Sequence, residues 1–128
     1  MWLKHLLASI LIFIGFGGYF FGSFLQPITA NEPHIQLISI DGYIDPVSSR
    51  YLSRSLDNAS KNNSTLVIVT LNTPGGLLSS TRKITRDIIN SPIPVVVYVS
   101  PNGAHASSAG TFILASSHIA SMAPGTHL

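Results

Sequence analysis

The chain of 128 residues contains no cysteine. This absence excludes disulfide bonds, thiol nucleophiles and thiolate metal sites. Charged residues are also scarce, at 9% of the chain, and the formal net charge is only +2. The few basic side chains are scattered and form no stripe with aromatic residues, so we expect no binding of nucleic acid. The length allows a single domain at most.

The first apolar run of the chain covers residues 6–25, contains no charged side chain and follows Lys4. A cationic start before such a run is typical of a secretory signal or of a hydrophobic membrane helix. Cleavage after Ala30 and a retained anchor both fit the sequence. In either case the residues after Ala30 are expected on the extracytoplasmic side. We therefore expect a signal peptide or anchor in residues 1–30 and one globular region in residues 31–128.

The globular region alternates short apolar segments with amphipathic patterns. The order β-α-β-α-β-α-β predicts an α/β fold with a parallel sheet and right-handed crossovers. The second segment is continuously apolar, which is typical of a strand buried on both faces. The expected strands are residues 35–40, 66–71, 95–99 and 119–122.

Two helices are expected between the first three strands. Asp45 and Pro46 form the N-cap and first turn of the first helix. The expected apolar side of that helix carries Val47, Tyr51, Leu52, Leu56 and Ala59, and that of the second carries Leu77, Thr81, Ile84 and Ile88. The chain ends at Leu128, directly after a turn and without a covering helix, so we expect an incomplete domain.

Two glycine- or serine-containing loops follow neighbouring strands, at residues 72–76 and 101–111. Ligands of α/β proteins bind at the carboxyl ends of such strands. A serine among small residues before a helix is exposed at the positive end of the helix dipole. Taken singly, the first loop also fits a tight turn and the second a helix cap. Together they predict a nucleophile with backbone N–H groups beside it.

Several motifs in these segments resemble the membrane-bound serine proteases of the NfeD family, which are relatives of ClpP in the crotonase-like superfamily. They occupy residues 41–44, 72–77, 101–111 and 122–126. The resemblance implies a ClpP/crotonase-like fold in which Ser108 is the nucleophile. It places Gly75 and Gly76 in the oxyanion loop, and the N–H of Ala109 follows the nucleophile as a second donor.

The same resemblance implies a Ser-Lys dyad whose lysine lies on a later element, yet no lysine follows Lys83. A serine hydroxyl needs a base to become a good nucleophile. His105, His118 and His127 are possible substitutes, but no acidic partner is obvious beside them. Their spacing does not match metal ligands on one helix face, so we expect no metal and no cofactor.

The leading hypothesis is therefore an exported, membrane-associated serine endopeptidase that cleaves hydrophobic peptide segments, with its catalytic lysine outside this chain. By resemblance its substrates are membrane-protein segments and its partner is stomatin-like; a homo-oligomer is also compatible. The alternative is an inactive ClpP-fold scaffold or peptide-binding module. A third hypothesis, an acyl-CoA enzyme, conflicts with export. The isolated chain is expected to be inactive because the base is missing.

Overall fold

The computed structural model describes residues 33–128, in which strands and helices alternate. The expected signal peptide or hydrophobic helix in residues 1–30 lies outside these described residues. Within residues 33–128, no helix has the length and apolar character needed to cross a membrane. The elements are β1 (Ile35–Asp41), α2 (Pro46–Lys61), β2 (Leu66–Asn72), α3 (Leu78–Ile89), β3 (Val95–Val99), α4 (Ala109–Ala115) and β4 (Ile119–Met122).

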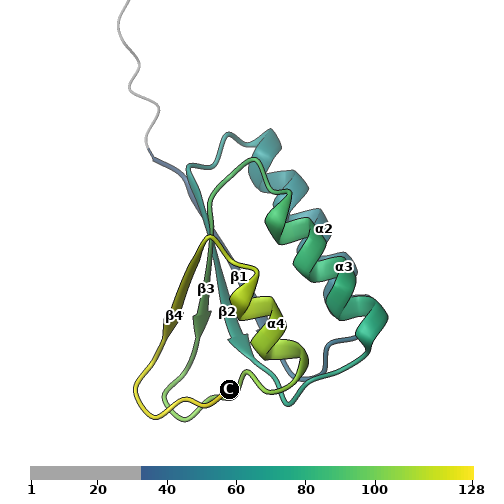
Figure 1. Cartoon of the computed structure of the whole chain (residues 1–128). Helices are drawn as coiled ribbons and strands as arrows, with labels where there is room; N and C mark the ends of the chain where they lie inside the picture. The colour runs from purple at the N-terminus through teal and green to yellow at the C-terminus, as the bar shows by residue number, and fades with distance from the viewer. Residues whose placement is uncertain (1–32) are drawn as a thin grey trace, which may run out of the picture. The chain divides into compact units, whose positions relative to one another are not determined.

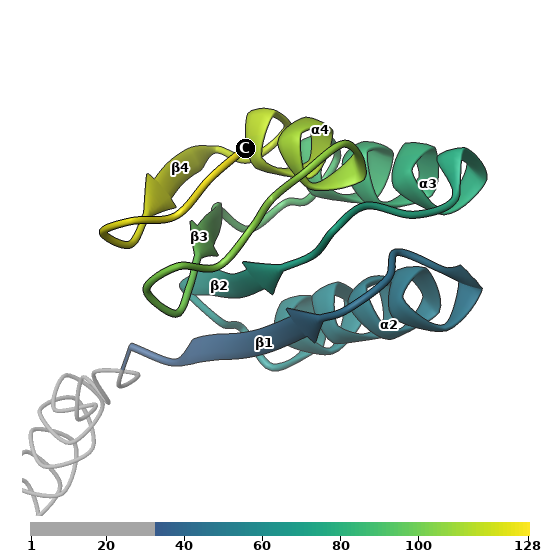
Figure 2. The same cartoon turned by 90° about the horizontal axis from the view of Figure 1, so that it is seen from below.

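The strands form one sheet in the order β1-β2-β3-β4, and every neighbouring pair is parallel. Each connection moves one place along the sheet in the same direction. Right-handed crossovers in a single direction place all helices on one face, and Figures 1 and 2 show α2, α3 and α4 on the same side of the sheet. The predicted α/β fold with a parallel sheet is confirmed.

The hydrophobic core lies between the sheet and this helical layer. Alternate residues of β1, β2 and β3 point into it because successive side chains of a strand face opposite sides. The helices contribute apolar side chains from one stripe each. The largest fully buried side chains are Ile38, Ile44, Leu52, Val67, Val69, Leu71, Ile84, Ile88, Val95, Val97, Val99 and Ile113.

Three burial predictions are wrong. Residues of β2 that alternate with the core positions, including Leu66 and Ile68, are half-buried rather than buried, because the helices cover a single face of the sheet. Val47 and Tyr51 of α2 are 63% and 47% exposed. The buried stripe of α2 is narrower than the predicted side, and Leu77, the residue before α3, is likewise exposed.

The start of α2 follows the prediction. The Asp45 carboxylate accepts hydrogen bonds from the N–H groups of Val47 (2.8 Å) and Ser48 (2.7 Å). The Ser48 hydroxyl accepts in return from the N–H of Asp45 at 2.9 Å, which completes a capping box. Because this cap fixes where α2 begins, it also sets the path of the chain that leaves β1.

Candidate active site

Beyond the strand ends, the chain continues in a short extension of the sheet at its carboxyl edge. The N–H of Thr73 donates to the carbonyl of His105 (2.6 Å), and the N–H of Ser107 donates to the carbonyl of Thr73 (3.1 Å). The N–H of Ala106 donates in turn to the carbonyl of His127 at 2.7 Å. Residues 104–107, which we call the strap, therefore lie between Thr73 and the C-terminal segment.

The loop after β2 is held on its other side by Ile44. The N–H of Ile44 donates to the carbonyl of Gly75 (2.9 Å), and the N–H of Leu77 donates to the carbonyl of Ile44 (2.7 Å). A Cβ atom on Gly76 would overlap the backbone of Ile44. This close approach requires glycine at position 76, because any side chain would push the loop away from the Ile44 backbone.

The two glycines differ in what their N–H groups do. The N–H of Gly75 donates to the Thr73 hydroxyl at 3.0 Å, so its hydrogen-bonding capacity is already used. The N–H of Gly76 has no acceptor within residues 33–128, and Gly76 is exposed whereas Gly75 is buried. Of the two glycine donors predicted as alternatives, Gly76 is the one whose N–H is unpaired among the described residues.

Ser108 is the residue that joins the strap to α4. Its backbone has φ 52° and ψ −105°, an uncommon conformation for a residue with a side chain. Ser108 is exposed, whereas Ala109 and Gly110, the next two residues, are buried. The N–H of Ala109 has no acceptor in the described part of the chain. Strained backbone of this kind is concentrated at functional sites.

The structure brings the predicted site residues together. A Cβ atom built on Gly75 would lie 3.1 Å from the Cβ of Ser108 and 3.5 Å from its Oγ. The N–H groups of Gly76 and Ala109 belong to the residues next along the chain from Gly75 and Ser108. The sequence expectation that the two loops meet at the carboxyl ends of adjacent strands therefore matches the observed geometry.

Thr73 supports this site and was not singled out by the sequence. It is fully buried, and its hydroxyl fixes the turn through Gly75. Its methyl group also lies under α4, since a Cβ atom on Gly110 would be only 2.8 Å from the Thr73 Cγ2. Threonine hydroxyls can close a turn by a hydrogen bond to the backbone two residues later, so the sequence contained a signal for this role of Thr73.

The described lysines and His118 are positioned away from Ser108. The Nζ of Lys83 lies 2.6 Å from the Ser53 hydroxyl and 2.8 Å from the Asp87 carboxylate, in contacts that join α2 to α3. Lys61 is in the last turn of α2. The Nδ1 of His118 accepts from the N–H of Val95, at the opposite edge of the sheet. Within residues 33–128, no lysine or histidine side chain is hydrogen-bonded to the hydroxyl of Ser108.

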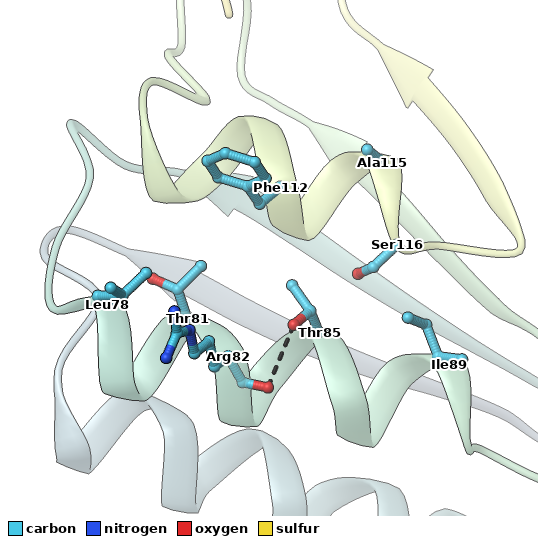
Figure 3. Close-up of a pocket in the computed structure, with 8 residues that line it drawn as sticks. All are labelled: Leu78, Thr81, Arg82, Thr85, Ile89, Phe112, Ala115 and Ser116. Atoms are coloured by element: carbon cyan, nitrogen blue, oxygen red, sulfur yellow. Dashed lines mark hydrogen bonds between the residues drawn. The ribbon is translucent and has the colours of Figure 1, made fainter.

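A groove of about 540 Å³ separates α3 from α4 (Figure 3). Leu78 and Phe112 stand at one end of it, near the starts of the two helices, and Ile89 and Ser116 stand at the other. Leu78 and Phe112 are 61% and 64% exposed. The groove therefore presents apolar side chains close in sequence to the glycine loop and to Ser108, although Ser108 is not part of its lining.

Comparisons of the sequence identify the family. A family model described as "NfeD1b, N-terminal domain" matches residues 34–128. The membrane-bound protease PH1510 of Pyrococcus horikoshii is 38% identical over 103 residues, which cover 80% of this chain and 23% of that protein. The membrane protein NfeD1b of Bacillus subtilis is 33% identical over 96 residues, which cover 75% and 21%. The chain thus spans less than a quarter of the length of these curated relatives.

Solved structures agree with this family and show the fold. The 1510-N membrane protease specific for a stomatin homolog from Pyrococcus horikoshii superposes with a TM-score of 0.70 at 38% identity, over 74% of this chain and 48% of that one. ClpP1 from Listeria monocytogenes superposes with a TM-score of 0.65 at 20% identity, over 72% and 54%, which shows a shared fold. The chain has a ClpP-like fold and belongs to the NfeD family, matching the N-terminal domain of NfeD1b.

Proposed function

We propose that this chain supplies the nucleophile and the oxyanion donors of a serine endopeptidase in a membrane-associated protein. The observation that carries the proposal is the proximity of Ser108 to Gly75, which places an exposed hydroxyl on strained backbone beside a glycine loop, 3.5 Å from where a Cβ of residue 75 would be. The N–H groups of Gly76 and Ala109, the residues that follow Gly75 and Ser108 in the chain, have no acceptor within residues 33–128. Preorganised donors of this kind stabilise the negative charge that develops during acyl transfer.

In the proposed reaction, the Ser108 Oγ attacks the carbonyl carbon of a peptide bond. The carbonyl oxygen becomes an oxyanion and accepts hydrogen bonds from the N–H groups of Gly76 and Ala109. A general base takes the hydroxyl proton and returns it to the leaving amine as the C–N bond breaks. Water then hydrolyses the acyl-enzyme and regenerates the serine. The base we propose is a lysine from a part of the protein outside this chain.

The proposed substrates are extended, apolar peptide segments on the extracytoplasmic side of the membrane. The solved 1510-N relative is named as specific for a stomatin homolog, so a stomatin-like protein is the first candidate substrate or partner. The exposed side chains of Leu78 and Phe112 support an apolar preference, because a large apolar residue near the cleaved bond would bury them.

The test is the Ser108→Ala substitution in the full-length membrane protein that contains this domain, assayed on an apolar peptide from a stomatin-like protein. We expect the cleavage rate to fall about 10³-fold or more, because the nucleophile is lost. The matched control is Ser107→Ala, which removes the neighbouring hydroxyl and should keep most of the activity. Unchanged cleavage after Ser108→Ala, with the melting temperature preserved, would exclude Ser108 as the nucleophile.

The second candidate function is a peptide-binding module without catalysis. It is favoured by one observation: among the described residues, no basic side chain is hydrogen-bonded to Ser108. The same assay separates the two functions. If the wild-type full-length protein binds the apolar peptide but releases no product over hours, and Ser108→Ala binds it equally well, the binding module is correct.

A further inference from the structure

Two histidines at the carboxyl edge have no part in the proposed reaction. His105 lies on the strap and His127 on the C-terminal segment, and the two residues are paired as neighbours in a parallel bridge. Their backbones are tied together, since the N–H of His127 donates to the carbonyl of Ala104 (3.1 Å) and the N–H of Ala106 donates to the carbonyl of His127 (2.7 Å). Both side chains are exposed, so water and ions reach the rings.

The backbone of His105 is fixed from its other side as well. Its N–H donates to the side-chain oxygen of Asn72 at 3.0 Å, and the amide nitrogen of Asn72 donates to the Asp41 carboxylate at 2.9 Å. The two imidazoles are therefore carried by a rigid frame. The backbone hydrogen bonds therefore keep the two Cα positions close together before any ligand arrives.

The imidazole rings lie side by side, with centres 5.3 Å apart and planes inclined by 32°. Zinc binds histidine nitrogens at 2.0–2.1 Å in tetrahedral geometry, which places the centres of two bound rings roughly 5 Å apart. The observed distance between the ring centres is therefore compatible with two histidines that bind one ion. The last side-chain torsion of histidine is broad and both rings are exposed, so each ring is free to rotate and turn one nitrogen toward a shared ion.

We propose that His105 and His127 form a binding site for one borderline transition-metal dication, such as Zn²⁺ or Ni²⁺. Within residues 33–128, no group of three or more histidine or acidic side chains is placed to hold a metal ion, so water completes the coordination shell. Neutral imidazole suits zinc, copper and nickel, whereas magnesium and calcium require oxygen ligands. The bound ion joins the strap that leads to Ser108 to the segment after β4.

The proposal is tested by titrating ZnCl₂ into the full chain without a histidine tag, in detergent micelles at pH 7.5, with NMR of ¹⁵N-labelled histidines as the readout. We expect one Zn²⁺ per chain, and the resonances of His105 and His127 should move together while those of His34 and His118 stay in place. MgCl₂ at the same concentration should move none of them.

Substitutions give a second measurement that does not involve peptide cleavage. His105→Asn and His127→Asn should each weaken Zn²⁺ binding at least tenfold, and His34→Asn, at an exposed residue of the same type, is the matched control that should leave it unchanged. Circular dichroism establishes that each variant is folded. Equal affinity in His105→Asn and the wild type, equal shifts of all histidines, or no shift at 1 mM ZnCl₂ would overturn the proposal. Since the readout is metal binding, failure of the peptidase proposal leaves this result unaffected.

Discussion

Two non-glycine residues in the described part of the chain have positive φ. Asn63, with φ 53°, lies at the amino ends of the strands, which we call the amino edge of the sheet, and Ser108, with φ 52°, lies at their carboxyl ends, the carboxyl edge. Asn63 follows α2 in a helix-ending motif in which the N–H of Ser64 donates to the carbonyl of Ala59 (2.9 Å) and that of Asn63 to the carbonyl of Ser60 (3.2 Å). Asparagine tolerates this conformation, so the helix-ending motif alone explains the positive φ of Asn63.

No such local motif accounts for Ser108. Serine is not a preferred residue at positive φ, and two groups distant in the sequence hold the conformation: Thr73, which is hydrogen-bonded to the strap just before Ser108, and Gly75, which lies beside the Ser108 side chain. A positive φ therefore has a different structural role at each of the two edges. At the amino edge it ends a helix, whereas at the carboxyl edge it presents a hydroxyl beside a glycine loop.

The largest expected effect comes from filling the space at Gly76. In Gly76→Ala the new methyl group would overlap the Ile44 backbone, so the loop must move. We expect a loss of about 3 kcal/mol in the free energy of unfolding, measured by urea denaturation. The matched control is Gly42→Ala, where φ is +104° but no atom lies within 4 Å of the new Cβ; strain alone should cost about 1 kcal/mol. Equal losses would show that the loop is not tightly held.

The next largest effect is expected at Thr73, whose hydroxyl is buried at the carboxyl edge, and its control is Thr65, whose hydroxyl is exposed at the amino edge. Thr73→Val keeps the shape of the side chain but leaves the buried N–H of Gly75 without its acceptor, which should cost about 2 kcal/mol in unfolding free energy. Thr65→Val removes a 3.3 Å hydrogen bond from an exposed side chain to the carbonyl of His34 and should change stability by less than about 0.5 kcal/mol. If Thr73→Val is equally mild, the hydroxyl does not hold the turn.

The secondary structure could be predicted from the sequence because its signals are local. The strand β3 is a β-branched run bounded by prolines, and the structure gives it the predicted bounds, Val95–Val99. The position of Ser108 before a helix was likewise visible, and α4 begins at the next residue, Ala109. Local patterns thus located the elements and the two loops of the candidate site.

The features that could not be predicted depend on residues far apart in the chain. The strap is positioned by hydrogen bonds to Thr73 and His127, and neither partner is adjacent to it in sequence. Which part of the apolar side of α2 meets the sheet is set by the packing of α2 against β1 and α3, so periodicity alone placed Val47 and Tyr51 wrongly. Backbone strain at Ser108 is a consequence of the same distant contacts.

Replacing each positive-φ residue by glycine, in separate variants, tests whether the backbone is strained at Ser108 and unstrained at Asn63. Ser108→Gly should abolish peptide cleavage by the full-length protein and raise the unfolding free energy by about 1 kcal/mol, because glycine adopts the serine's backbone conformation without strain. Asn63→Gly should change stability by no more than about 0.5 kcal/mol, since asparagine already accommodates its angle. Thermal unfolding of the two variants measures the difference. A loss of stability in Ser108→Gly would mean that the conformation carries no strain.

The smallest expected effect concerns acid at the start of α2. Hydrogen bonds from the backbone N–H of Ser48, and then from its side chain and from Val47, hold the pKa of Asp45 below its ordinary value of 3.8. The ionised carboxylate therefore contributes stability above pH 3.8, and this contribution is lost as the pH falls through the lowered pKa of the folded state. Asp45→Asn retains a good N-cap but carries no charge. The melting temperature of the wild type should exceed that of Asp45→Asn by a constant margin from pH 5 to 7, and the margin should shrink below pH 3.8; a margin independent of pH would show that the charge of the cap does not stabilise α2.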